Sequence, residues 1–267
     1  MIYMIFFNFI KDRLIEKGSN AQINLLDIGC SNKVPKHFSR FEKYINYIGC
    51  DPDPVGLDRT RIFLKKRKFL RYDLLNVGAS NIESKAFLNI EEKRTGSFIV
   101  SEKKESTISV DLMETSNLQK KFNKQSANII KIDCEGHELN VIEGIDFQEN
   151  SLMIIEVECT INEIKENTIG KIIDKLEKND FFIGSLRYHN EQTVSEKKFR
   201  NKILKKIFIF FGILGFVKLL DRWTDLSGKV DFGLNKSFIK QIEIVFVKQK
   251  RCIPNQKLKM YYNSLLI

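Results

Sequence analysis

The sequence predicts an α/β fold in which a mostly parallel, doubly wound sheet is covered by helices on both faces. Three observations indicate this fold. Short apolar runs recur along the 267 residues, helix-compatible segments separate them, and several runs end in Asp or Gly where the chain must turn. Since crossovers between parallel strands are right-handed and contain a helix, such alternation favours βαβ units.

Seven segments have the apolar composition of buried strands: 23–29, 44–51, 68–75, 127–133, 151–158, 181–188 and 240–249. Helix-compatible segments lie between most of them: 34–44, 56–68, 117–125, 136–145 and 161–179. We therefore expect a seven-stranded sheet. Residues 85–113 differ, because short β-like pieces flank a polar loop there, and they are interpreted as an embellishment of the sheet.

The chain has only four prolines and no linker or internal repeat, so we expect a leading helix at 1–20 and a single domain at 21–267. Within that domain, residues 190–238 form an insertion before the last strand. The leading segment is too short to span a bilayer and lacks the features of a secretory signal. Packing on the domain and contact with a membrane both remain open for it.

The composition indicates which classes of partner the protein can bind and in which cellular compartment it is expected. The chain is 43% hydrophobic and 29% charged, as globular proteins are, and its net charge of +10 suits anionic partners. Five cysteines form no CxxC pair, which favours packing over metal binding and a reducing, cytoplasmic location.

Ligands of such sheets bind beyond the carboxyl ends of the strands. The first strand ends in Asp27-Ile28-Gly29-Cys30-Ser31, where a glycine allows close backbone approach. No GxGxxG follows, so a dinucleotide pyrophosphate site is poorly supported. Asp51 ends the second strand, where an acid can accept both hydroxyls of a ribose. Asp53 fits the role of a helix cap better.

The segment "KIDCEGHELNVIEG" (131–144) ends the fourth strand and begins a helix. Asp133 and Glu135 are candidates for orienting a substrate hydroxyl or taking its proton. Glu138 is better explained as an acid that complements the helix dipole. His137 is either a general base or an exposed residue at the helix start. Glu156 and Glu158 share one face of the next strand and were expected to converge on the same site.

These segments resemble a known family. "KIDCEGHELNVIEG" is similar to the K-I-D-x-E-G-x-E-x-x-V-x-x-G signature of FkbM-type methyltransferases. "LLDIGCSNKVPKHF" resembles the first motif of that family, "YIGCDPDP" its ribose motif, and "LLNVGASNIESKAFLNI", "STISVDLME" and "MIIEVE" its following segments. The resemblance covers residues 22–160. The first loop lacks the second and third glycines of the motif.

The resemblance implies the Rossmann-like fold of class I methyltransferases, S-adenosylmethionine as cofactor, and O-methylation of a hydroxyl on a sugar or polyketide. We expect a glycan or glycolipid acceptor. The residues expected to bind the cofactor are Asp27, Gly29, Cys30, Ser31, Asp51 and Asp73. The residues expected to be catalytic are Asp133, Glu135 and His137. Methyl transfer from a sulfonium requires alignment and exclusion of water but no phosphate cradle.

Residues 196–206 carry six Lys or Arg against one Glu, and an apolar run follows at 207–217. A helix over this run is about 16 Å long, roughly half the thickness of the hydrocarbon core. Segment 201–223 is therefore interpreted either as a helix lying in the surface of an anionic membrane, on its cytoplasmic face, or as a lid or dimer helix packed on the core.

Two other functions are compatible with such a sheet. A nicotinamide-dependent oxidoreductase on a similar sheet lacks support, because GxGxxG and Tyr-x-x-x-Lys are both absent. A non-catalytic, membrane-associated binding module rests only on the glycine-poor first loop. Nucleic acid is not an expected substrate, since the acid-Pro-Pro-aromatic motif common in those methyltransferases is replaced by Asp-Cys-Glu-Gly.

Overall fold

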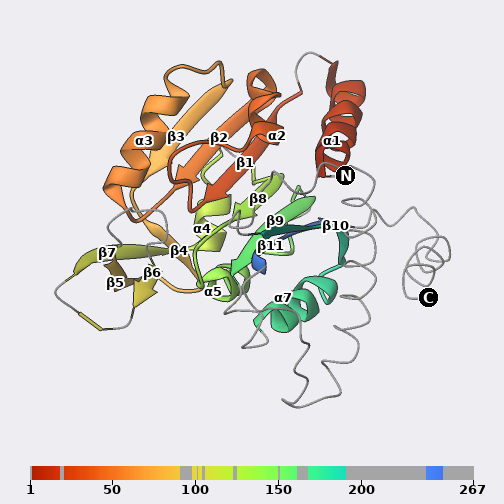
Figure 1. Ribbon diagram of the computed structural model, residues 1–267. Coiled ribbons are helices and arrows are strands. Elements are labelled where there is room, and N and C mark those ends of the chain that lie inside the picture. Colours follow the sequence, from red (N-terminus) through yellow and green to blue (C-terminus); the bar gives the residue numbers. More distant parts are fainter. Residues whose placement is uncertain are drawn as a thin grey trace, which may run out of the picture. The chain divides into compact units, whose positions relative to one another are not determined.

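A computed structural model describes residues 2–18, 21–90, 98–100, 102–103, 106–122, 125–149, 151–160, 168–190 and 239–248. By contacts the chain divides into two compact units, Met1–Tyr188 with Gln241–Lys248, and His189–Lys240 with Gln249–Ile267. The first unit carries the fold and the site (Figure 1). Apart from Asn190, the predicted insertion at 190–238 lies outside the described residues, as does the whole of segment 201–223.

The main sheet has seven strands in the order β10-β11-β9-β8-β1-β2-β3. Their bounds are β1 Ile23–Ile28, β2 Ile45–Cys50, β3 Arg71–Leu75, β8 Ile129–Ile132, β9 Ile154–Thr160, β10 Phe181–Asn190 and β11 Ile239–Lys248. The pairs from β3 through β2, β1 and β8 to β9 are all parallel, whereas β11 runs antiparallel to β9. The seven predicted strands are confirmed, and the sheet is mixed at one side.

The helices are α1 Ile2–Lys17, α2 Lys36–Ser39, α3 Pro54–Leu64, α4 Thr115–Gln119, α5 Glu138–Glu143 and α7 Thr168–Glu177, with a 3-10 turn at Glu42–Tyr44. In Figure 1, α3 lies at the upper left beside β3, α1 lies at the upper right, and α5 and α7 lie below β8 and β9. The helix predicted at 34–44 is broken into α2 and the 3-10 turn. The helix predicted at 117–125 ends at Gln119, because the backbone turns there and Gln125 donates to the carbonyl of Phe122.

A second sheet of four strands follows β3 in the sequence. It contains β4 Gly78–Ser80, β5 Ser84–Asn89, β6 Phe98–Val100 and β7 Thr107–Glu114, in the order β4-β7-β5-β6. This sheet confirms the β-like embellishment predicted around 85–113. It packs closely on α5, since a Cβ on Gly144 would lie 2.3 Å from the carbonyl oxygen of Ser80. The small sheet is thereby fixed beside the end of α5.

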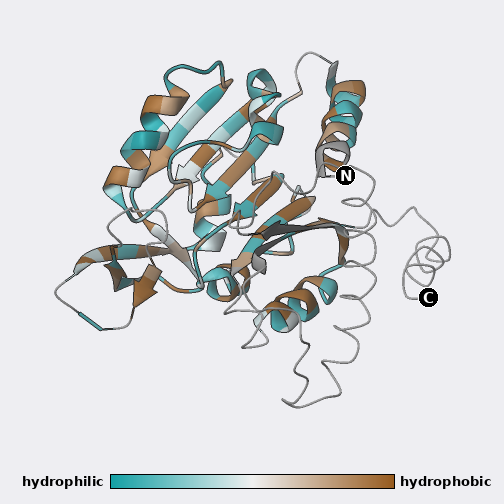
Figure 2. Ribbon diagram, viewed as in Figure 1, coloured by the Kyte–Doolittle hydropathy of each residue, from teal (hydrophilic) through white to brown (hydrophobic). Residues whose placement is uncertain are grey.

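The core below α1 is apolar and tightly packed. The ring of Phe6 stacks on His37 with centroids 4.9 Å apart and meets the edge of Phe38 at 4.8 Å. Phe6 and Ile10 are fully buried, so the leading helix packs on the sheet unit. In Figure 2, β8 and β9 are mostly hydrophobic, whereas α3 and α7 carry both kinds of residue. Among the helices that the structure describes, none is sufficiently long and apolar to cross a bilayer.

Candidate active site

Gly29 brings the ends of β1 and β8 together. Its φ is +78°, and a Cβ built on it would lie 1.8 Å from the carbonyl oxygen of Asp133. Only glycine fits such a position without moving the backbone. The amides of Gly29 and Cys30 both donate to the carbonyl of Cys50, at 2.9 and 3.3 Å, and the amide of Asp133 donates to Ile28 at 3.0 Å. Three strand ends therefore converge on one glycine.

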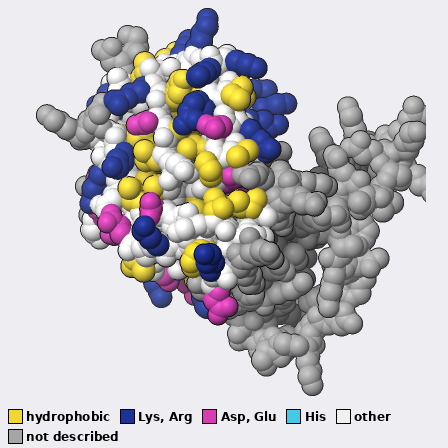
Figure 3. Space-filling view, turned by 90° about the vertical axis from the view of Figure 1, so that its left-hand side faces the viewer, with side chains coloured by type: hydrophobic (Ala, Val, Ile, Leu, Met, Phe, Trp, Pro, Cys, Tyr) yellow, Lys and Arg dark blue, Asp and Glu magenta, His cyan; other side chains and the backbone are white. Residues whose placement is uncertain are grey.

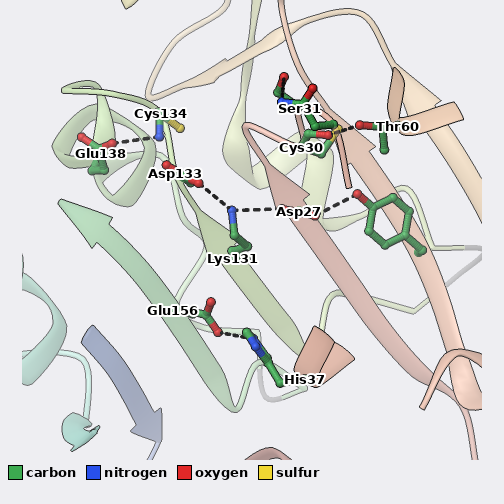
Figure 4. Close-up of polar contacts among 12 residues, drawn as sticks. Asp27, Cys30, Ser31, His37, Thr60, Lys131, Asp133, Cys134, Glu138 and Glu156 are labelled. Atoms are coloured by element: carbon green, nitrogen blue, oxygen red, sulfur yellow. Dashed lines mark hydrogen bonds and ion pairs between the residues drawn. The ribbon is translucent and has the colours of Figure 1, made fainter. Parts of the chain in front are cut away.

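The loop after Gly29 is held from α3. The hydroxyl of Thr60 donates to the carbonyl of Cys30, whose side chain is buried (Figure 4). Asn32 has a left-handed φ of 76° and donates to the hydroxyl of Ser31 at 3.1 Å. Arg59 donates to the Asn32 side chain at 3.3 Å. The single-glycine loop is thus fixed by side chains where the usual motif has further glycines.

Asp51 lies at the end of β2 and is 7% exposed. Its Oδ1 accepts from the amide of Asp53 at 2.8 Å, and Asp53 in turn accepts from the amide of Val55 at the start of α3. The capping role predicted for Asp53 is confirmed. Burial raises the pKa of Asp51 to about 7, against the amide of Asp53, and the nearby carboxylate charges add to the rise. This acid is therefore poised to titrate near neutral pH.

Lys131 links two acids below the strand ends (Figure 4). Its Nζ lies 3.1 Å from Oδ2 of Asp133 and 3.5 Å from Oδ1 of Asp27. Tyr47 donates to the other oxygen of Asp27 at 2.8 Å. Burial alone would lower the pKa of Lys131, but the charges of Asp133, Asp27 and Glu156 together hold it well above its usual value. Lys131 thus stays charged and neutralises the cluster.

Burial raises the pKa of Asp27, although Lys131 and Tyr47 counteract the rise. Asp27 is 1% exposed, and the ammonium of Lys131, 3.5 Å from its Oδ1, is the cation that balances its charge. Such a carboxylate depends on the ammonium beside it.

The loop from Cys134 to His137 presents Glu135. The buried carboxylate of Glu138 accepts from the amides of Cys134 and Gly136, at 2.8 and 2.9 Å. These bonds support the structural interpretation of Glu138, since they satisfy amides ahead of the helix. Glu135 has a positive φ of 51°, and Gly136 follows at 106°. The tight turn places the half-buried Glu135 beside the strand ends.

His137 faces the small sheet. Its Nε2 lies 3.1 Å from the hydroxyl of Ser80 on β4, and burial lowers its pKa. The ring is therefore neutral at neutral pH. This contact joins the start of α5 to the small sheet.

The acid expected from β9 has a different partner. Glu156 is buried and its Oε2 lies 2.9 Å from Nε2 of His37, on α2. In the sheet register it stands beside Lys131, which stands beside Asp27, so a row of charged side chains crosses three strands. Glu156 does not converge on the strand-end cavity as the sequence suggested.

A cavity of about 270 Å³ opens at these strand ends. Five of the predicted residues line it: Gly29, Ser31, Asp51, Asp133 and Glu135. The other lining residues are Ile28, Asn32, Cys50, Pro52, Asp53, Gly78, Ala79, Leu88, Ile99 and Cys134. The lining contains four acids and no Lys or Arg among the described residues, which suits a cation without phosphates.

Four predicted residues do not line this cavity. Asp27 and Cys30 are buried beside it, His137 contacts Ser80, and Asp73 lies exposed on the edge strand β3 with its Oδ1 accepting from the amide of Leu74. Their assignments stay predictions.

Some contributors were not recognised from the sequence, namely Lys131, Tyr47, His37 and the apolar wall of the small sheet. One signal for Lys131 was available, because its spacing of two from Asp133 puts both on one face of a strand.

The family profile described as "Methyltransferase FkbM domain" matches residues 18–183. This chain belongs to that family. As a family member, the methyltransferase uses S-adenosylmethionine as its methyl donor, and the family argues against the nicotinamide alternative. The cavity fits the donor, because its lining offers four acids and no Lys or Arg among the described residues to a bound sulfonium, and Gly29 has no Cβ to obstruct its approach.

The chain is also distantly similar to solved structures. The precorrin-6y C5,15-methyltransferase of Geobacter metallireducens is 9% identical, with 93% of this chain and 87% of that chain covered and a TM-score of 0.43. An rRNA methylase of Streptococcus thermophilus is 9% identical, with 93% and 96% covered and a TM-score of 0.44. Among curated proteins, none matches the chain.

Gly29→Ala should destabilise the methyltransferase by about 2–4 kcal/mol, from the strained φ plus the overlap with the carbonyl of Asp133. Gly18→Ala is the matched control, because Gly18 has a φ of +60° but open space around its Cβ position. It should cost only about 1 kcal/mol. The free energy of unfolding in urea measures both, and equal losses would show that the contact between β1 and β8 is not tight.

Lys131→Met should destabilise the fold by about 3–5 kcal/mol, because it leaves the buried carboxylate of Asp27 and the half-buried carboxylate of Asp133 without their counter-charge. Adding Asp133→Asn to Lys131→Met should restore part of that loss, since one of the two charges is then gone. A double-mutant cycle of urea unfolding measures the coupling. Strictly additive effects would mean that the two side chains do not interact.

Asp51→Asn should remove a pH-dependent loss in the free energy of unfolding. With a pKa of about 7 when folded and 3.8 as its ordinary value, Asp51 keeps a proton in the folded state that the unfolded state releases. The free energy of unfolding therefore falls as pH rises from about 4 to about 7, by up to about 4 kcal/mol, and stays low above that. Relative to wild type, the variant should gain stability as pH rises from about 4 to about 7 and keep that gain at higher pH. Stability profiles of the two proteins that run parallel over this range would contradict the raised pKa.

Proposed function

We propose that the methyltransferase transfers a methyl group to a hydroxyl of a sugar, in a glycan or glycolipid. The observation that carries the proposal is the cavity lining, which combines Asp51, directly after β2, with Asp133 and Glu135, directly after β8. One side can hold a donor ribose while the other receives an acceptor hydroxyl. The resemblance of the segment 131–144 to FkbM-type enzymes supports the same assignment.

In this proposal, residues at the carboxyl ends of β1 and β2 bind the donor. Asp51 would accept hydrogen bonds from the ribose hydroxyls, and the backbone at Gly29 and Ser31 would border the methionine part. Asp27 and Cys30 act beneath them by fixing the backbone. The bound sulfonium supplies an electrophilic methyl group.

In this proposal, residues of the loop after β8 activate the acceptor hydroxyl. Glu135 lines the cavity and is presented by a turn that Glu138 fixes, so it is our candidate for the base that takes the hydroxyl proton. Asp133 is held by Lys131, which suits it to orienting the hydroxyl rather than taking its proton. His137 is placed to act as a positioning residue through Ser80.

The acceptor wall is apolar. Ala79, Leu88 and Ile99 line the cavity from the small sheet, and such surfaces pack against the nonpolar face of a sugar ring or a short lipid segment. With segment 201–223 interpreted as an interfacial helix, a lipid-linked saccharide is the acceptor we favour.

The test is transfer of labelled methyl from S-adenosylmethionine to saccharide and glycolipid acceptors. Glu135→Gln should lower kcat by about 100-fold or more while leaving the Kd of the donor unchanged, because the proton acceptor is lost but the donor side is intact. Glu177→Gln on the exposed end of α7 is the matched control and should keep full activity.

Full turnover by Glu135→Gln would remove that residue from the mechanism. Donor binding without transfer to any saccharide or glycolipid would contradict the proposed acceptor, and transfer to RNA in its place would reassign it. No turnover with any acceptor would favour a non-catalytic binding module.

A further inference from the structure

A basic surface covers α3 and the chain that follows it to β3. Seven cations and no acid lie between residues 59 and 72: Arg59, Arg61, Lys65, Lys66, Arg67, Lys68 and Arg71. We name the exposed side chains of residues 55–72 the α3–β3 face. Figure 3 shows the side of the molecule that carries α3 and β3, with Lys and Arg side chains interleaved with hydrophobic ones.

Much of the charge on this face is not neutralised. Arg61 pairs with Asp58, and Arg67 pairs with Glu42 at 2.6 Å. Lys65, Lys66 and Lys68 are exposed, and within the part of the chain that the structure describes no ion pair is found for them. Three ammonium groups thus lie close together in sequence and face solvent, ready for an anionic partner.

Large apolar side chains are exposed among these cations. Ile62 is 57% exposed and Leu70 48%, and Val55 and Tyr72 are each 38% exposed. These four are half of the eight large hydrophobic residues exposed in the described parts of the chain. Val55 and Ile62 are seven residues apart on α3, which puts them on one side of that helix.

The α3–β3 face adjoins the cavity. Asp53, which caps α3, and Pro52 before it both line the cavity. Arg59 on α3 donates to Asn32, another lining residue. A surface bound to this face would therefore lie next to the mouth where donor and acceptor meet.

We propose that the α3–β3 face docks onto an anionic lipid bilayer. Lysines at such a surface are attracted to acidic headgroups, while apolar and aromatic side chains enter the interface. Nucleic acid fits less well, because a phosphate backbone offers nothing to exposed Ile62 and Leu70. A second copy fits less well too, since the same cations would meet across a symmetric interface. The proposal stands independently of the acceptor, because binding is measured without methyl transfer.

The experiment is co-sedimentation of the full-length protein with phosphatidylglycerol vesicles, using phosphatidylcholine vesicles for comparison. Wild type should bind the anionic vesicles, and more weakly at high salt. The variant Lys65→Gln/Lys66→Gln/Lys68→Gln should partition about 100-fold more weakly, at roughly fivefold for each lysine. Lys171→Gln/Lys175→Gln/Lys178→Gln on and after α7 removes the same charge elsewhere and should bind like wild type.

Ile62→Ser provides a second test, since it should weaken binding while leaving net charge and salt dependence unchanged. The three lysines are exposed, so donor binding should persist in their variant and report a folded protein. The proposal is overturned if wild type does not bind anionic vesicles, if the Lys65/Lys66/Lys68 and Lys171/Lys175/Lys178 variants bind alike, or if the face binds duplex DNA or RNA in preference to vesicles. Vesicle binding that survives the Lys65/Lys66/Lys68 variant would point to segment 201–223 instead.

Discussion

The ion pairs of Lys131 are the constraint on which the strand-end site depends. A single ammonium lies between Asp27 and Asp133, on two adjacent parallel strands whose ends also meet at Gly29. Without that charge, the buried carboxylate of Asp27 would have no counter-ion beside the half-buried carboxylate of Asp133, at a considerable cost in free energy. With it, both strands can end in acids. The sheet can therefore present carboxylates to a ligand while part of its charge is balanced from below.

The residues that stabilise the strand ends differ from those that line the cavity. Asp27 is buried against Tyr47 and Lys131, and Cys30 is buried with its carbonyl bonded to Thr60, whereas Asp51, Asp133 and Glu135 line the cavity. Below the cavity, the row from Asp27 through Lys131 to Glu156 continues to His37, which stacks on the leading helix. The leading helix α1 is thus connected, through His37 and Glu156, to Lys131 on β8.

The strands were predictable because each is a short apolar run with a turn residue at its end. Asp51, Asp133 and Glu135 were predictable for the same reason, since a parallel sheet brings strand ends together. Helix lengths were less predictable from the sequence. Turns with local hydrogen bonds end the helices early within the predicted segments 34–44 and 117–125. The pairing of Glu156 with His37 depends on a contact across 119 positions, which periodicity cannot reveal. The site of Asp73 depended on the resemblance alone, and the cavity does not include it.

The four-stranded sheet has a consequence for how acceptor choice can change. Its residues supply the apolar wall of the cavity, yet it is a separate hydrogen-bonded layer that meets the start of α5 through Ser80 and His137. Substitutions on its inner side can reshape the pocket for new molecules without disturbing the acids beneath. The range of acceptors can therefore change through substitutions in the small sheet, while the seven-stranded sheet and its acids stay the same.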